Sequence, residues 1–93
     1  MGVGDVYVRS TKILEKTLDD ELLLIDGDTD VILNLNPLGT AVWRFLVTPR
    51  ETNEIIEVLI AAFPDIPEEQ IREDTSRLLD QLVDRQLLVV HKD

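Results

Sequence analysis

The chain of 93 residues has no cysteine and a single histidine, His91. It therefore cannot form a disulfide or a thiolate metal site, and it has no Cys nucleophile. One histidine cannot build a His-based metal cluster or a catalytic triad within the chain, and no glycine-rich phosphate loop is present. We expect no metal, no cofactor and no independent enzymatic activity.

Long apolar runs are also missing. No stretch reaches the roughly 18 to 20 residues that span a bilayer. The first ten residues, MGVGDVYVRS, contain no basic region followed by an apolar stretch, as a secretory signal would. These features predict a cytoplasmic protein with no membrane partner.

Basic residues are scarce. The sequence has 9 Lys and Arg against 19 Asp and Glu, a net charge of -10. Binding to a nucleic-acid backbone relies on clustered cations, so nucleic acid is not an expected partner. Both halves of the chain are acidic, which gives no sign of a charged tail or a second domain. We expect one domain over residues 1–93.

Three alternating carboxylates, Asp26, Asp28 and Asp30, resemble the start of a calcium loop. An EF-hand needs Gly at loop position 6 and Glu at position 12, where this chain has Val31 and Pro37. The pattern favours a solvated hairpin turn instead.

The first third of the chain has strand patterns. Val6 and Val8 alternate with Tyr7 and Arg9, a weak signal. Stronger apolar runs, residues 22–25 and 31–35, flank Asp26-Gly27, a step that suits a turn with positive φ. We predict a β-hairpin in which Val31, Leu33 and Leu35 share one face.

The opposite face of that strand carries Ile32 and Asn34. An apolar Ile32 there has two explanations that the sequence leaves open. The first is structural: the sheet is covered on both sides, or its register is shifted. The second is functional: the strand edge accepts another segment by β-augmentation.

The remainder of the chain has helical patterns. Asn36 as N-cap and Pro37 at the first helical position begin one helix. The second begins either with a capping box over residues 48–51 or with Thr52 as its N-cap. The third is expected from about Pro67 to about Arg85. Apolar residues follow helical spacing in each. They are Leu38, Ala41, Val42, Phe45 and Leu46 in the first, Ile55, Ile56, Leu59, Ile60 and Phe63 in the second, and Ile71, Thr75, Leu78, Leu79, Leu82 and Val83 in the third.

Two further features complete the expected fold. Residues 87–90 form a last strand or a packed tail, and Trp43, beside the first apolar stripe, is expected in the core. The order of elements predicts an α+β fold. It is a small winged-helix-like domain in which an N-terminal antiparallel two- or three-stranded sheet is followed by three helices.

An ordered set of short patterns over roughly residues 20–90 resembles the PqqD-like family. The set comprises Leu35-Asn36, Gly39, Val42-Trp43, Arg50, Thr52, Glu54-Ile55, Pro67-Glu68-Glu69, Asp74, Leu78-Leu79, Leu82 and Leu87-Leu88. The chain differs from members that serve pyrroloquinoline quinone (PQQ) synthesis at Trp43, which is commonly aliphatic there. It also differs at Ile66, where the family often has Asp. The resemblance therefore leaves open whether the pathway is PQQ synthesis or another peptide pathway.

The resemblance implies a non-catalytic peptide-binding adaptor, a RiPP recognition element. Such domains bind the leader segment of a ribosomally made precursor peptide and present it to a modifying enzyme, in several pathways a radical-SAM enzyme. In the family the leader adds to the third strand and lies against the third helix. On this chain the implied peptide-binding residues are Val31, Ile32, Leu33, Asn34, Ile71, Asp74, Thr75 and Leu78. Because Glu73 and Asp74 border the implied groove, we expect a basic residue in the leader to gain association rate.

Two other functions are compatible with the same elements. Three helices and a hairpin can build a winged-helix DNA-binding regulator, although residues 67–85 contain three Arg against six Asp and Glu. A free strand edge can also pair with its own copy, which would make the chain a structural homodimer without a peptide ligand.

Overall fold

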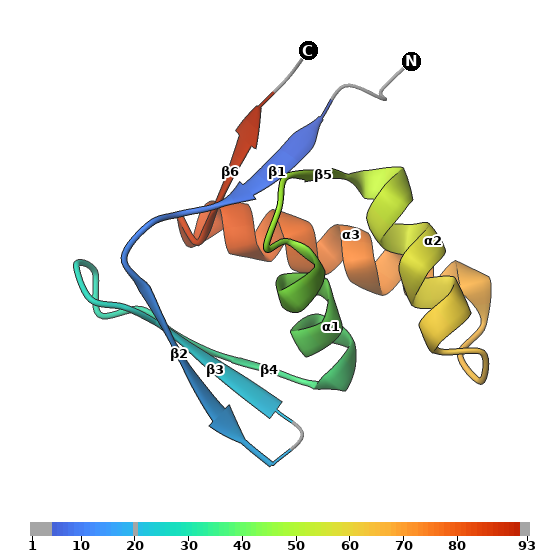
Figure 1. Cartoon of the computed structure of the whole chain (residues 1–93), viewed down its shortest axis with the longest axis horizontal. Coiled ribbons are helices and arrows are strands. Elements are labelled where there is room, and N and C mark those ends of the chain that lie inside the picture. Colours follow the sequence, from blue (N-terminus) through green and yellow to red (C-terminus); the bar gives the residue numbers. More distant parts are fainter. Residues whose placement is uncertain (1–4, 20, 92–93) are drawn as a thin grey trace.

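The computed structural model describes residues 5–19 and 21–91 (Figure 1). Within them the order of elements is four strands, three helices interrupted by a short strand, and a last strand. The predicted α+β fold, with antiparallel strands followed by three helices, is confirmed. None of the described helices is long and apolar enough to cross a membrane.

The first sheet has the strand order β2-β3-β4, with all pairs antiparallel. β3 (Glu21–Asp26) and β4 (Ile32–Leu35) form the predicted hairpin. β2 (Ile13–Leu18) was not predicted, because almost all of its residues are exposed and no alternation of burial marks it. Leu22 and Leu24 of β3 are buried against the helices, which fixes the inner face of this sheet.

The turn between β3 and β4 differs from the prediction in one respect. The residue with positive φ is Asp30 (φ 59), not Gly27. The carboxylate of Asp26 accepts a hydrogen bond from the Asp28 N–H at 2.9 Å, and the Asp26 carbonyl accepts one from the Asp30 N–H at 2.9 Å. These local bonds hold the turn. In the part of the chain that the structure describes, no three His, Asp or Glu residues are grouped to hold a metal ion.

The second sheet has the order β5-β1-β6. β1 (Val6–Arg9) does not join the hairpin but pairs along its length with β6 (Leu88–His91), so strands from opposite ends of the chain lie side by side (Figure 1). Of the two predictions for residues 87–90, a last strand or a packed tail, the strand is confirmed, and it covers Leu88–His91. β5 (Arg50–Glu51) adds a short bridge on the other side of β1.

The helices begin and end close to the predicted residues. In α1 (Pro37–Phe45) the Asn36 side chain accepts the Gly39 N–H at 2.8 Å, as expected of an N-cap. α3 (Glu68–Asp84) agrees with the predicted range. α2 (Thr52–Ala62) is capped by Glu51, whose N–H donates to Glu54 Oε1 at 3.0 Å, and both predicted starts were wrong. Pairing with β1 keeps Glu51 extended, so the helix begins directly after it.

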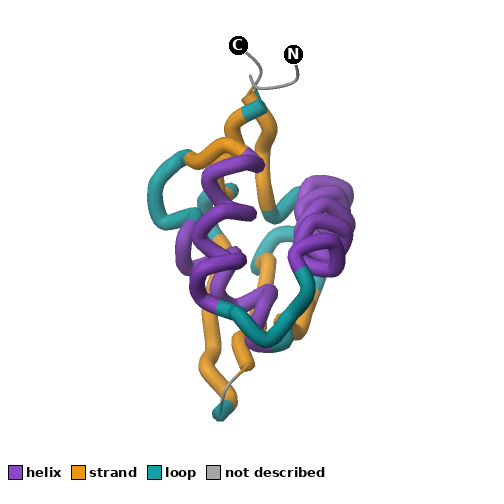
Figure 2. The backbone as a smooth tube through the Cα atoms, turned by 90° about the vertical axis from the view of Figure 1, so that its right-hand side faces the viewer, coloured by secondary structure: helices purple, strands orange, loops and turns teal. Residues whose placement is uncertain are grey.

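The core lies between the inner face of the β2–β4 sheet and the helices: α1 contacts β3 and β4, and α2 and α3 pack against α1 and each other. The three helices lie on one side of this sheet (Figure 1), and Figure 2 views the molecule from that side. Its fully buried side chains include Leu22, Leu24, Val42, Trp43, Leu46, Ile55, Leu59, Ile71, Thr75, Leu79, Leu82 and Leu87. The predicted place of Trp43 in the core is therefore correct.

Trp43 also joins the two sheets. Its indole Nε1–H donates to Glu15 Oε2 of β2 at 2.9 Å, and the Arg9 guanidinium of β1 lies 4.6 Å from its ring centroid. Arg9 donates to the Trp43 carbonyl and pairs with Glu15 at 3.2 Å. Burial lowers the pKa of Arg9 and the Glu15 carboxylate raises it, with a net lowering. The guanidinium remains charged at neutral pH, so the ion pair and the ring contact persist.

Candidate functional site

β4 is an edge strand, because it pairs with β3 and with no other described strand. The Val31 carbonyl accepts the Asp26 N–H at 2.9 Å, so Val31 directs its backbone toward β3. Backbone groups alternate along a strand. Ile32 and Asn34 therefore direct their N–H and C=O groups to the open edge, where they can pair with an added strand.

A groove runs between this edge and α3. Two adjoining hollows of about 260 and 200 Å³ share Asn36, Gly39, Leu78 and Gln81 in their walls. The remaining wall residues are Leu33, Asn34, Leu35, Leu38, Asp74 and Arg77. We call this feature the β4–α3 groove. Its walls are mixed: Leu33, Leu35, Leu38 and Leu78 supply the apolar side chains, and the remaining side chains in the walls are polar.

The polar end of the groove is locally neutral. Asp74 and Arg77 both line it and lie 3.4 Å apart as an ion pair. Glu73 is exposed and is not among the lining residues, so of the expected acidic border of Glu73 and Asp74 only Asp74 lines the groove. One helical turn brings Asp74 and Arg77 together, and the arginine compensates the carboxylate.

Of the eight residues implied by the resemblance, four line the groove: Leu33, Asn34, Asp74 and Leu78. Ile32 contributes to the open edge, and Val31 precedes β4 outside the groove walls.

Ile71 and Thr75 are not in the groove, which corrects the implied set. Both side chains are 0 % exposed in the core. At 100° per residue, Ile71, Thr75 and Leu79 lie on a helix face about 90° from the face of Asp74, Leu78 and Gln81. Only the second face borders the groove.

Six lining residues were not anticipated: Leu35, Asn36, Leu38, Gly39, Arg77 and Gln81. Arg77 and Gln81 had a signal in the sequence, because they follow Asp74 and Leu78 at i+3 on the same helix face. The other four residues had a weaker signal in the sequence. α1 begins directly after β4, so its first turn must lie at the end of the same groove.

Gly39 lets the first turn of α1 approach β4 closely. A Cβ at this position would lie 3.3 Å from Asn36 Oδ1 and 3.3 Å from Leu35 Cβ. These are tight contacts on two residues of the groove wall, so we expect a larger residue at position 39 to shift that wall.

Leu78 is half-buried, whereas Leu79 is 1 % exposed. Leu79→Ala is expected to lower the free energy of unfolding by about 2–5 kcal/mol, as for a buried leucine. Leu78→Ala should cost clearly less, because water or a ligand can fill the space it vacates. Urea denaturation of both variants measures the difference. Equal losses would mean that Leu78 belongs to the core rather than to the groove.

Comparison with known proteins gives the family of the chain and a solved structure with a similar fold. The family model described as Coenzyme PQQ synthesis protein D (PqqD) matches residues 21–88, which is most of the chain. A search of curated proteins gives no significant match. A solved structure titled "TbiB1 in Complex with the TbiA(beta) Leader Peptide" superimposes with a TM-score of 0.78 at 22 % identity, covering 92 % of this chain and 99 % of that one. At this identity the likeness concerns the fold, while the family match extends over most of the sequence, and the chain therefore belongs to the PqqD family.

Proposed function

We propose that this protein is a non-catalytic adaptor that binds the leader segment of a ribosomally made precursor peptide at β4 and presents it to a modifying enzyme. The observation that carries the proposal is an open strand edge directly beside a groove in which leucine side chains lie among polar ones. The maturation of PQQ, which the family description names, is one pathway that this proposal includes.

Strand addition uses the edge and the groove together. The peptide backbone would pair with the outward N–H and C=O groups of Ile32 and Asn34. Every second side chain of an added strand points to the same face, so alternate residues would enter the groove between Leu33 and Leu78. Backbone bonds supply affinity, and the apolar pockets fix the register.

The comparisons support this reading. TbiB1, whose fold the chain shares, is named in a complex with a leader peptide. The adaptor would then act by tethering, because a bound leader holds the rest of the precursor at high local concentration near an enzyme that also contacts the adaptor. No chemistry by the adaptor itself is needed for this role.

The DNA-binding alternative is disfavoured by the charge of α3. This helix contains Arg72 and Arg77 against six acidic residues, Glu68, Glu69, Glu73, Asp74, Asp80 and Asp84. A recognition helix of this composition would repel phosphates.

The proposal can be tested with the synthetic leader of the precursor peptide encoded beside the gene of this chain. Titrated into the ¹⁵N-labelled protein, the leader should shift amide resonances mainly over residues 32–35 and 74–81. Sedimentation of the mixture should give one peptide per protein monomer.

Three results would overturn the proposal. The first is no binding of the leader, and the second is a set of shifts confined to residues 52–63, in and directly after α2. The third is a dimer of the protein alone that the leader does not dissociate. The last result would mean that the edge pairs with a second copy of the chain.

A further inference from the structure

The outer face of the β2–β4 sheet, turned away from the helices, is unusually apolar. Strand register and alternation place eight residues on it: Leu14, Lys16 and Leu18 of β2, Glu21, Leu23 and Ile25 of β3, and Ile32 and Asn34 of β4. Five of the eight are aliphatic. We call this set the outer sheet face.

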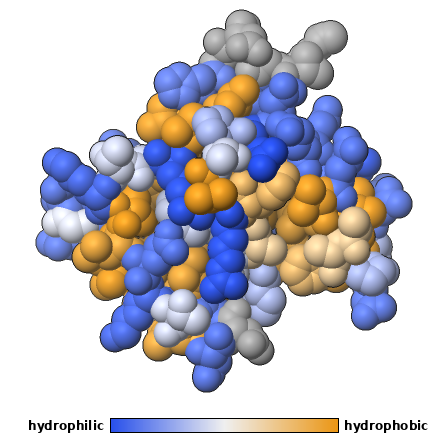
Figure 3. Space-filling model, viewed as in Figure 1, coloured by the Kyte–Doolittle hydropathy of each residue, from blue (hydrophilic) through white to orange (hydrophobic). Residues whose placement is uncertain are grey.

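One end of the outer sheet face is a continuous apolar row across all three strands. Leu14 pairs with Ile25, and Ile25 pairs with Ile32. Leu14 is 62 % and Ile32 59 % exposed, and Leu18 adds a third exposed side chain on β2. Figure 3 shows apolar side chains at the surface over this sheet, at the left of the view. Apolar side chains gathered in this way on a sheet face mark interaction sites.

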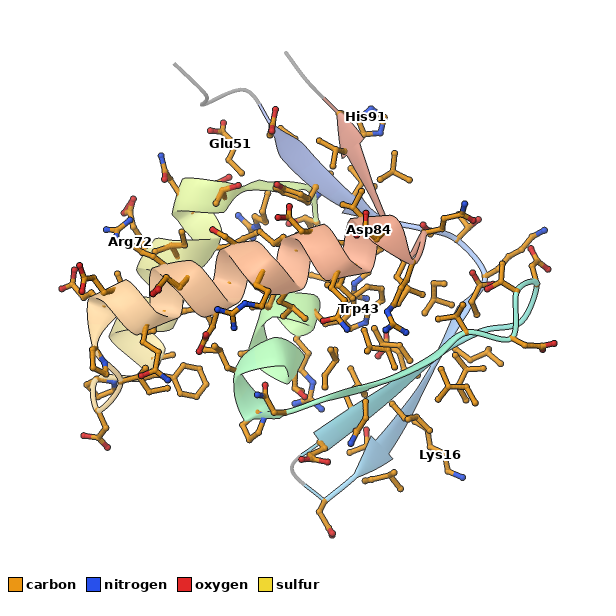
Figure 4. The ribbon with its side chains drawn as sticks, turned by 180° about the vertical axis from the view of Figure 1, so that it is seen from behind. Lys16, Trp43, Glu51, Arg72, Asp84 and His91 are labelled. Atoms are coloured by element: carbon orange, nitrogen blue, oxygen red, sulfur yellow. The ribbon has the colours of Figure 1, made fainter. Side chains whose placement is uncertain are left out.

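The outer sheet face has no net charge on a protein of net charge -10, because Lys16 and Glu21 are the two charged residues among its eight. Glu21 Oε1 accepts a hydrogen bond from Asn34 Nδ2 at 2.9 Å, so this carboxylate is engaged on the surface. Lys16 points away from the helices (Figure 4) and makes no ion pair with any residue in the described ranges. Its ammonium is available to a carboxylate on a partner.

The face is continuous with the proposed peptide site. Ile32 and Asn34 present their side chains on the outer sheet face and their backbone groups at the open edge of β4. A leader added there would extend the same sheet, and every second leader side chain would emerge beside Ile32. The adaptor and its peptide would then form one surface.

The charge of the protein argues against a second copy of the chain as the occupant of this face. Docking two copies through it would bring two proteins of net charge -10 into contact, and their repulsion would oppose the dimer.

We infer that the outer sheet face docks the enzyme that modifies the bound peptide, through an apolar patch on that enzyme with a carboxylate opposite Lys16. This inference rests on the proposed function and adds the surface on which the enzyme binds. The enzyme contacts the adaptor and the outward side chains of the leader together, so its affinity is higher for the loaded adaptor than for the free one.

The test uses the purified modifying enzyme encoded beside the same precursor gene, and it measures the binding of enzyme and of leader separately by calorimetry. Leu14→Glu places a charge in the apolar row on β2, two strands from the peptide edge. We expect its Kd for the enzyme to rise by about tenfold or more, with its Kd for the leader changed less than about twofold. Lys16→Glu should weaken enzyme binding in the same way.

Val58→Glu is the matched control. Val58 is an exposed aliphatic residue on α2, remote from β4, and the substitution adds the same charge. It should alter neither Kd. Circular dichroism of each variant verifies folding.

The outcomes are distinguishable from failure of the proposed function. If the leader does not bind the unaltered protein, the proposed function fails. If the leader binds but Leu14→Glu retains full enzyme affinity, or if the unaltered protein does not bind the enzyme, the docking surface is wrong. An equal effect of Val58→Glu, or a dimer of the unaltered protein that Leu14→Glu dissociates, also overturns the inference.

Discussion

Ile32→Pro is expected to weaken leader binding by about tenfold or more while the protein still folds. Proline has no N–H, and the Ile32 N–H points to the open edge of β4 rather than to β3. The substitution therefore removes a donor that the peptide needs and no bond of the β3–β4 ladder. The proline ring also projects toward the added strand. Calorimetric titration with the leader gives the change in Kd, and thermal unfolding shows that the fold is retained.

Ile32→Ala separates the backbone from the side chain. It keeps the N–H and shortens a side chain that lies on the outer sheet face, outside the groove. Its Kd for the leader should stay within about twofold of the unaltered protein. If both variants lose affinity equally, the side chain rather than the strand edge binds the peptide. If the proline variant binds normally, the peptide does not add to β4.

Trp43→Ala is expected to cause the largest loss of stability, about 3–5 kcal/mol. The alanine leaves a large cavity in the centre of the core, since Trp43 is 1 % exposed. It also removes the ring beneath Arg9 and the donor to Glu15, which together tie β1 and β2 to α1. A domain this small has a total stability near the lower end of about 5–15 kcal/mol. Urea denaturation should therefore find the variant only marginally folded.

Trp43→Phe distinguishes packing from hydrogen bonding. Phenylalanine fills much of the space but cannot donate to Glu15, so the expected loss is about 1–2 kcal/mol for the unpaired group, with a further small loss from the smaller ring. A loss equal to that of Trp43→Ala would indicate that the hydrogen bond to Glu15, rather than packing, stabilises this junction.

The sequence by itself determined the elements whose causes are local. The β3–β4 hairpin follows from two apolar runs around a turn-forming segment, and its turn is held by bonds of Asp26 to residues two and four positions away. The start of α1 follows from Asn36 and Pro37, because an N-cap and a fixed φ act on adjacent residues. The extent of α3 follows in the same way from its apolar spacing. The ordered patterns over residues 20–90 also carried the resemblance to the family that the matched model shows.

The residues of the groove were predicted only in part. α3 has a broad apolar stripe. The helical periodicity of the sequence identifies the residues of this stripe, but it does not tell which of them contact the other helices and which contact β4. Packing against α1 and α2 decided that Ile71 and Thr75 face the core, while Leu78 faces β4.

The tertiary structure alone decided the pairing of distant segments. β1 pairs with β6 across nearly the whole chain, and Glu15 meets Trp43 from a strand that no burial pattern marks. Neither contact leaves a local signature, because the free energy of a strand pair or a buried hydrogen bond depends on a partner many residues away. The open edge of β4 also depends on such a distant pairing. β1 pairs with β5 and β6 in the second sheet, so among the described strands β4 has β3 as its one neighbour.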